Sequence, residues 1–217
     1  MVSPAVEDYL KAIYQLSRDG EPASTSAIAE RLGVAAGSVT GMLKRLADQG
    51  LVEHTRYYGA LLTDRGRDHA VQTIRRHRIL ELFLVQILGY TWDRVHEEAE
   101  RLEHVASEEM IDRMAHVLGE PAEDPHGAPI PVTGESFTEA SYPSLTDLEA
   151  GRRAVLRRVP DEDPAALRYL AGMNLVPGVE IEVLERAPFN GPLTVRIGHT
   201  RHVLGRELSD TIRVEPI

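Results

Sequence analysis

Hydrophobic positions in the first fifty residues recur with the period of an α-helix. Apolar side chains appear every three or four positions between residues 3 and 17, where Pro4 suits the first helical turn. The same period predicts a short helix over 24–32, which Gly33 ends, and a longer helix over 36–49. Two helices joined by a turn that contains glycine are typical of a helix-turn-helix.

A β-hairpin is expected directly after the third helix, because residues 51–62 show strand alternation on both sides of Gly59. A hairpin in this place favours a winged helix-turn-helix that binds DNA over a small helical core without a ligand. The candidate DNA contacts are small, hydroxyl-bearing or basic residues, each also compatible with an ordinary surface position: Gly37, Ser38, Thr40, Lys44, Arg45 and Arg56. Few of them can read base edges, so we expect DNA shape to carry part of the specificity.

A long helix is predicted over 63–88, followed by one that starts at Thr91 or Asp93 and by another over 107–118. The last turns of the long helix, residues 79–88, are apolar on nearly every side. Such a segment should be buried against more than its own domain. We therefore expect these helices to form the interface of a dimer with two-fold symmetry.

The second half of the chain changes character twice. Residues 119–149 contain five prolines and no sustained period, which indicates a linker. From residue 151 onward, four short segments alternate with period two, separated by turns that contain glycine. A capped helix is expected over 163–170. This pattern favours a small SH3-like barrel, so the predicted fold is mostly α-helical with a small β module.

The formal net charge of −10 argues at first against a nucleic-acid partner, because phosphate binding needs a basic surface. The charge is uneven, however: residues 1–78 hold 11 Lys and Arg against 9 Asp and Glu, and the rest hold 13 against 25. The chain has no cysteine, so any metal must be held by oxygen and imidazole nitrogen. No apolar run is long enough to span a membrane, so we expect a soluble, cytoplasmic protein.

The stretch His96 to His104 reads HEEAERLEH and combines carboxylates and imidazoles at helical spacing. On a helix, Glu100, Glu103 and His104 occupy one stripe, and His96 lies one turn earlier. The same residues could simply form the solvated face of an amphipathic helix. The ligand types and their spacing nevertheless predict a metal site.

Four segments together resemble the diphtheria toxin repressor family of metal-dependent transcription regulators, and specifically its manganese-responsive branch. They are Glu7-Asp-Tyr-Leu10, Arg76-His-Arg78 with Glu81, the stretch from His96 to His104, and the linker segment Asp124-Pro-His-Gly-Ala-Pro-Ile-Pro. The resemblance covers the whole chain. It implies three domains: a winged helix-turn-helix over 1–70, a helical dimerisation and metal-binding domain with a Pro-rich linker over 71–140, and an SH3-like domain, similar to ferrous transport protein A, over 151–217.

The resemblance also implies two sets of metal ligands. The primary set is Asp8, Glu100, Glu103 and His104, and the ancillary set is His77, Glu81 and His96, which Asp124, His126 and one of Asp161, Glu162 or Asp163 could complete. Hard carboxylates favour Mn²⁺, with Fe²⁺ as an alternative and Co²⁺, Cd²⁺ or Zn²⁺ as surrogates. Lys11 stands where some manganese regulators of the family carry a further carboxylate, which puts a binuclear primary site in doubt.

The expected function is that of a metal-dependent, homodimeric repressor that binds a double-stranded operator and controls genes of metal-ion homeostasis. In this hypothesis, metal ties Asp8 to the acidic helix and so favours the DNA-binding arrangement of the dimer. One alternative is a winged-helix regulator that needs no metal. A metallohydrolase is disfavoured, because the chain lacks the HExxH motif, and we expect no enzyme activity. The sequence identifies no protein partner and no membrane association.

Overall fold

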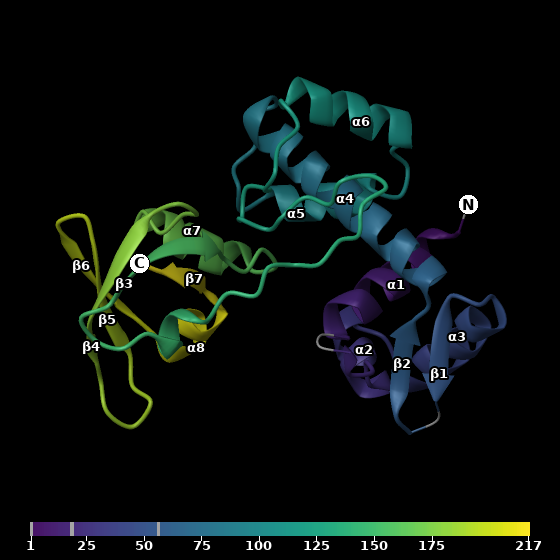
Figure 1. Ribbon diagram of the computed structural model, residues 1–217, viewed down its shortest axis with the longest axis horizontal. Coiled ribbons are helices and arrows are strands. Elements are labelled where there is room, and N and C mark those ends of the chain that lie inside the picture. The colour runs from purple at the N-terminus through teal and green to yellow at the C-terminus, as the bar shows by residue number, and fades with distance from the viewer. Residues whose placement is uncertain (1, 18–19, 56) are drawn as a thin grey trace. The chain divides into compact units, whose positions relative to one another are not determined.

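The computed structural model describes residues 2–17, 20–55 and 57–217 (Figure 1). The chain forms two compact units. The N-terminal unit comprises Met1–His77, Glu103–Ala106 and Pro131–Phe137, and the C-terminal unit comprises Arg78–Leu102, Ser107–Ile130 and Thr138–Ile217. The boundary falls within one long helix, α4 (Asp64–Gln86), so this helix contributes residues to both units.

Three helices and a hairpin build the N-terminal unit: α1 (Pro4–Leu16), α2 (Thr25–Leu32), α3 (Ala36–Asp48), β1 (Val52–Thr55) and β2 (Gly59–Leu62). The Ser24 side chain caps α2 by accepting from the Ala27 amide, and Gly33 closes the helix with a φ of 64°. β1 and β2 pair antiparallel beside α3 (Figure 1). The predicted winged helix-turn-helix is therefore confirmed, with its core formed by Leu10, Ile13, Ile28, Val39, Leu43 and Leu46.

The helices after the wing are α4, α5 (Val95–Leu102) and α6 (Glu108–Val117). The predicted acidic helix ends earlier than expected, because Glu103 and His104 lie in a turn rather than on the helix. A turn is needed here since the Ser107 side chain caps α6 only five residues after α5 ends. Of the helices that the structure describes, including the 23-residue α4, none is both long and apolar enough to cross a membrane.

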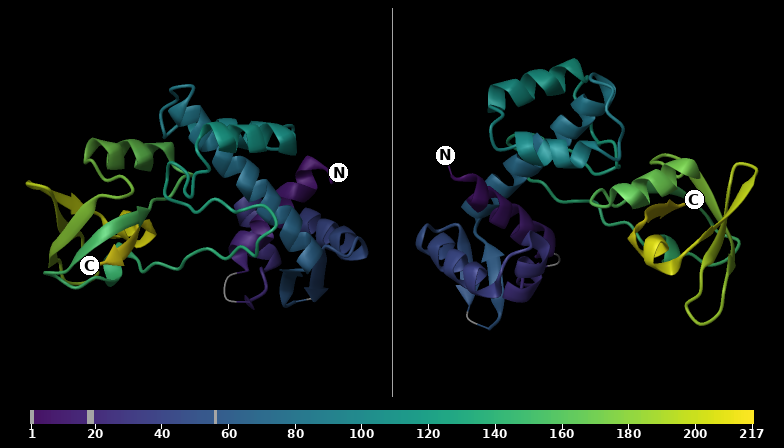
Figure 2. Two further views of the ribbon diagram at one scale, coloured as in Figure 1. Left: turned by 45° about the horizontal axis from the view of Figure 1, so that its top comes forward. Right: turned by 180° about the vertical axis from the view of Figure 1, so that it is seen from behind.

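The C-terminal part begins with the short 3₁₀ helix η2 (Leu145–Asp147) and continues as a five-stranded antiparallel sheet in the order β6-β5-β4-β3-β7. The strands are β3 (Arg153–Arg158), β4 (Glu180–Arg186), β5 (Leu193–Ile197), β6 (Thr200–Leu204) and β7 (Arg213–Pro216). Two helices, α7 (Pro164–Gly172) and α8 (Arg206–Thr211), accompany the sheet (Figure 2). Apolar residues of β3, β4, β5 and α7 fill one core. Four of the five strands lie where the period-two segments predicted them, whereas β3 was not predicted.

The predicted linker, residues 119–149, contains the short helix η2 near its end, and its part between α6 and η2 has no helix or strand in the described chain (Figure 2). Its stretch Pro131–Phe137 belongs to the N-terminal unit, where the Phe137 ring stacks on Tyr14 of α1 with centroids 6.4 Å apart. Earlier, residues 124–128 form a tight loop in the C-terminal unit, in which the Asp124 carboxylate accepts from the His126 and Ala128 amides. The linker thus contributes ordered contacts to each unit.

Candidate metal centre and DNA-binding surface

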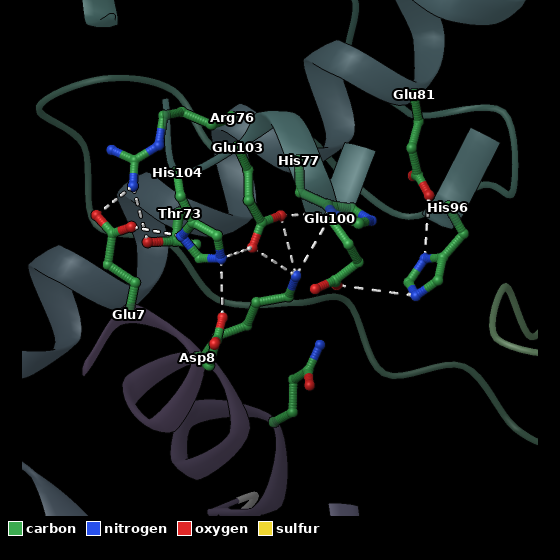
Figure 3. Close-up of polar contacts among 12 residues, drawn as sticks. Glu7, Asp8, Thr73, Arg76, His77, Glu81, His96, Glu100, Glu103 and His104 are labelled. Atoms are coloured by element: carbon green, nitrogen blue, oxygen red, sulfur yellow. Dashed lines mark hydrogen bonds and ion pairs between the residues drawn. The ribbon is translucent and has the colours of Figure 1, made fainter. Parts of the chain in front are cut away.

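The first group of metal-ligand type lies in the N-terminal unit and consists of Asp8, Glu103 and His104, whose ligand atoms all fall within 4.8 Å of one another (Figure 3). His104 Nε2 is 2.9 Å from Asp8 Oδ1 and 3.7 Å from Glu103 Oε1. Helix α1 supplies Asp8, and the turn after α5 supplies the other two. Two carboxylates and an imidazole form a donor set that suits a hard or borderline divalent cation.

Glu103 is completely buried, and a cation already lies against it. Lys11 Nζ is 3.0 Å from Oε1 and 3.1 Å from Oε2 of Glu103, and the Lys11 side chain is itself only 10% exposed. On the same carboxylate, Oε2 lies 2.5 Å from His77 Nδ1. A buried carboxylate without a positive partner would be strongly destabilising. Lys11, whose place in the family pattern puts a binuclear primary site in doubt, therefore supplies a positive charge directly against Glu103.

Glu7 also reaches this group, although the sequence reasoning gave it no role. Its Oε2 lies 2.7 Å from His104 Nδ1, and its Oε1 accepts a hydrogen bond of 2.7 Å from Arg76 Nη2 (Figure 3). In sequence, Glu7 is indistinguishable from the acidic residues that commonly occupy the first turn of a helix. Its signals were its place beside Asp8 and in the segment Glu7-Asp-Tyr-Leu10 that carries the family resemblance.

A second group lies in the C-terminal unit around Glu81 of α4. Glu81, Asp124 and His126 form one close set, and Glu81, His96 and Asp161 form another. Glu81 Oε1 is 3.3 Å from His96 Nδ1, and its Oε2 is 3.7 Å from His126 Nδ1. His126 Nε2 lies 2.9 Å from the Trp92 carbonyl oxygen, which can only accept, so Nε2 carries the proton and Nδ1 faces Glu81.

Two buried atoms of this second group have the chemistry of metal ligands, although Arg78 Nε lies 3.7 Å from one of them, Asp124 Oδ2. Among the residues that the structure describes, Asp124 Oδ2 and His126 Nδ1 are buried without a hydrogen-bond partner. Burial and the negative charge of Glu81 raise the pKa of Asp124 to about 6, against the opposing effects of Arg78 and His126. Burial lowers the pKa of His126, but the contact with Glu81 and the nearby Asp124 and Asp161 outweigh it and raise that pKa to about 9. The site thus attracts positive charge, as a proton or as a metal ion.

Glu100, His77 and Asp163 were also predicted as ligands, and each has its own contacts. Glu100 lies on α5 in the C-terminal unit, with Oε1 3.8 Å from His96 Nε2. His77, expected in the ancillary set, lies in the N-terminal unit against Glu103.

The three acidic residues 161–163 differ in their surroundings. Asp163 caps α7 by accepting hydrogen bonds from the Ala165 and Ala166 amides. Of the three, only Asp161 lies in a ligand group of the described residues.

The predicted DNA contacts lie on one exposed surface of α3. Gly37, Ser38, Thr40, Lys44 and Arg45 are all exposed, whereas Val39, Leu43 and Leu46 of the same helix are buried. The Thr40 hydroxyl donates to the Ala36 carbonyl 3.1 Å away. Arg56, the sixth candidate, lies outside the described residues.

Comparison with known proteins covers each part of the chain. Residues 1–60 match the N-terminal DNA binding domain of iron dependent repressors, residues 63–132 match their metal binding and dimerisation domain, and residues 144–216 match the FeoA domain. The iron-dependent repressor IdeR of Mycobacterium tuberculosis (strain ATCC 25618 / H37Rv) is 32% identical over 223 residues, which are 97% of this chain and 96% of that protein. The diphtheria toxin repressor of Corynebacterium diphtheriae is 29% identical over 221 residues, again 97% and 96% of the two chains.

Solved structures of metal-dependent regulators also resemble this chain over nearly its whole length. A manganese-dependent transcriptional repressor in complex with manganese superposes with a TM-score of 0.91 at 38% identity, covering 98% of this chain and 100% of that one. The manganese regulator SloR has a TM-score of 0.81 at 35% identity, with both chains fully covered. These likenesses extend over nearly the whole length of each protein and confirm the resemblance inferred from the four sequence segments. The chain therefore belongs to the iron-dependent repressor family of metal-dependent transcriptional repressors, the family of the diphtheria toxin repressor.

Proposed function

We propose that this chain is a Mn²⁺-dependent, dimeric repressor that binds an operator in genes of metal-ion homeostasis. The observation that carries the proposal is the convergence of Asp8, Glu103 and His104 to within 4.8 Å, on the same helix-turn-helix unit that carries α3. Family membership removes the metallohydrolase alternative, because the matched family consists of DNA-binding repressors. A repressor must reach the DNA that it regulates, so we propose the cytoplasm as its location.

Asp8, Glu103 and His104 would hold the primary ion, and Glu100, three positions before Glu103, remains the fourth ligand predicted from sequence. When bound, the ion supplies a positive charge that two carboxylates and an imidazole share. The chain's own contribution is to bring α1 and the turn after α5 to the same place. Without the cation, Asp8 loses its link to the turn after α5, although Lys11 still pairs with Glu103. We therefore expect α1 to sample more positions and the helix-turn-helix unit to bind DNA less well.

Manganese is proposed over iron because of the donor set. The predicted ligands are carboxylates and imidazole, and the chain contains no cysteine thiolate that would favour a softer metal. The relative from M. tuberculosis is named iron-dependent, whereas the solved structures at TM-scores of 0.91 and 0.81 are described as manganese regulators. Oxygen and nitrogen ligands do not exclude Fe²⁺, and they should accept Co²⁺, Zn²⁺ or Cd²⁺ in vitro.

The ancillary ion would be held by Glu81, Asp124 and His126, with His96 and Asp161 as further ligands of the same group. This arrangement involves residues of α4, the 124–128 loop and the segment before α7. Its support is the pair of buried atoms, Asp124 Oδ2 and His126 Nδ1, that find no hydrogen bond in the described chain. We therefore propose two metal sites per chain.

Dimer formation would cover the apolar surface of α4 and α6. Ile87 and Leu88, in the turn directly after α4, and Met110 and Val117 of α6 are between 47% and 63% exposed. Phe83, Met110, Met114 and Val117 also line a shallow hollow of about 380 Å³ between these helices. The matched family model includes dimerisation in its description, so we propose that this surface pairs with a second copy.

The function is tested by the effect of chelation on DNA binding. A duplex selected from a random pool with Mn²⁺ present is titrated with the protein, and binding is measured by fluorescence anisotropy at fixed salt, since phosphate contacts make affinity salt-dependent. We expect EDTA to lower the affinity and Mn²⁺ to restore it. Equal affinity with EDTA and with Mn²⁺ would instead support the winged-helix regulator that needs no metal.

A further inference from the structure

We propose that Glu7 is a positioning residue for the primary metal ion: it fixes the ring of His104 so that Nε2 is the nitrogen that binds. This inference rests on the proposed function of the primary site and adds a residue to it that the ligand set does not contain. It follows from contacts within the N-terminal unit alone (Figure 3).

The ring of His104 lies between two carboxylates that are consecutive on α1. Nδ1 is 2.7 Å from Glu7 Oε2, and Nε2 is 2.9 Å from Asp8 Oδ1. Because Asp8 and Glu103 both lie on the Nε2 edge, that nitrogen is the one within reach of the other ligands. A nitrogen that binds a metal ion must offer its lone pair, so the single proton of the ring must then be on Nδ1. Glu7 Oε2 accepts that proton's hydrogen bond and so selects the binding form of the ring.

Glu7 is itself held from α4. Its second oxygen, Oε1, accepts from Arg76 Nη2 at 2.7 Å, and the same Nη2 donates to Thr73 Oγ1 at 3.1 Å. Thr73 and Arg76 are one turn apart on the helix, and the Thr73 hydroxyl donates to the His69 carbonyl. The chain of contacts therefore runs from the backbone of α4 through Arg76 and Glu7 to His104. The side chains of Glu7, Arg76 and His104 are only 10–13% exposed, which limits both rotation and solvent screening.

Arg76 also explains why Glu7 should not act as a ligand. The guanidinium neutralises the Glu7 carboxylate, and both oxygens of that carboxylate already have partners within 2.7 Å. A carboxylate behind a metal-binding histidine raises the basicity of the ring and fixes its orientation, and loss of such a partner typically lowers metal affinity about 10- to 100-fold. We expect an effect of that size at Glu7.

The experiment compares Mn²⁺ affinity of the full chain in four forms at one pH, measured by the electron paramagnetic resonance of free Mn²⁺: wild type, Glu7→Ala, Glu7→Gln and Glu30→Gln. Glu30 is an exposed carboxylate of α2 in the same unit and serves as the matched control. We expect Glu7→Ala to lose about 10- to 100-fold in affinity. Glu7→Gln should lose much less, because its amide oxygen can still accept from Nδ1, and the control should equal wild type.

A second readout reports the ring directly. With histidines labelled with ¹⁵N and ¹¹³Cd²⁺ as the bound ion, the nitrogen that shows coupling to cadmium identifies the binding atom of His104. We expect Nε2 in the wild type and in Glu7→Gln, and a weaker or mixed signal in Glu7→Ala. The proposal is overturned if Glu7→Ala binds Mn²⁺ like wild type with unchanged coupling at Nε2, or if Glu7→Gln and Glu7→Ala lose affinity equally, as a direct ligand would.

One further variant, Asp8→Asn, distinguishes a failure of the Glu7 proposal from a failure of the proposed primary site. If the wild type binds two Mn²⁺ ions and Asp8→Asn removes one of the two binding steps while Glu7→Ala changes neither, the primary site stands and only the role of Glu7 is wrong. If Asp8→Asn leaves Mn²⁺ affinity unchanged, the proposed primary site itself is wrong.

Discussion

At the scale of single residues, the primary group is organised by pairs of opposite charge within the chain itself. Glu103 is buried against Lys11, and Glu7 is bonded to Arg76. Asp8, by contrast, has a side chain that is 38% exposed. The buried members of the group are thus neutralised by the chain's own cations, and Asp8 is the member best placed to respond to a metal ion.

Substitution of Lys11 should separate stability from metal affinity. Lys11→Met leaves Glu103 buried without its ammonium partner, so the free energy of unfolding without metal should fall by about 3–5 kcal/mol. Mn²⁺ affinity should rise at the same time, because a positive charge near the site is gone. Chemical denaturation with EDTA and with Mn²⁺ measures both effects. A variant as stable as wild type in EDTA would show that Lys11 does not hold Glu103.

The stability of the metal-free protein should depend on the protonation of His126. With its pKa raised to about 9 in the folded chain, against 6.5 ordinarily, the folded state holds a proton that the unfolded state loses. This contribution, about 3 kcal/mol at most, is fully present below pH 6.5 and is lost as the pH rises through 9. Urea denaturation in EDTA from pH 6.5 to 9 should show the decline, and His126→Gln should reduce its slope. An unchanged slope in the variant would exclude His126 as its source.

At the scale of secondary-structure elements, periodicity was a good guide to the helices and strands and a poor guide to their ends. The first three helices and the hairpin were predicted to within a few residues, because each has a buried apolar side and clear turn residues. The helix over His96 to His104 stops at Leu102, since the chain must turn before Ser107 caps α6. Helix α8 was not predicted, because six residues are too few for a period to show.

The two acidic residues beside α7 should have different functions. Asp163 caps the helix, so Asp163→Ala should lower stability by about 1 kcal/mol without changing the amount of Mn²⁺ bound. Asp161 lies in the ligand group of Glu81 and His96, so Asp161→Asn should weaken the ancillary site with little effect on stability in EDTA. Thermal unfolding measures the stability of both variants, and metal titration measures the Mn²⁺ that each one binds. Loss of metal binding in Asp163→Ala alone would reverse the assignment.

The loop that carries His126 depends on Gly127. This residue has a φ of 86°, and a Cβ added to it would lie 1.8 Å from the Arg157 carbonyl oxygen of β3. Gly127→Ala must therefore displace the loop, at a cost of about 1–3 kcal/mol from backbone strain alone. The indole of Trp92, the chain's single tryptophan, stacks on His126 with centroids 5.7 Å apart, so its fluorescence should report the displacement. Unchanged fluorescence and metal stoichiometry would show that the loop tolerates the methyl group.

At the scale of the whole molecule, sequence reasoning and structure differ in what they can establish. Composition and periodicity predicted a helical protein with a small β module, but they could not show which distant residues meet. Glu81 and His126 are 45 positions apart, and only the resemblance to a family placed them in one site. Glu7 and Arg76 both lie in segments that carry the family resemblance, but they are 69 positions apart and nothing in the sequence showed that they meet beside His104.

The central claim is that an ion at Asp8, Glu103 and His104 and operator DNA favour the same state of the protein. Such coupling is reciprocal, so the factor by which Mn²⁺ raises DNA affinity must equal the factor by which DNA raises Mn²⁺ affinity. The most direct measurement is therefore Mn²⁺ affinity with and without the selected duplex, in wild type and in Asp8→Asn. We predict that the duplex tightens Mn²⁺ binding about 5- to 150-fold in wild type and has no such effect in the variant. Equal Mn²⁺ affinity with and without DNA in the wild type would contradict the account.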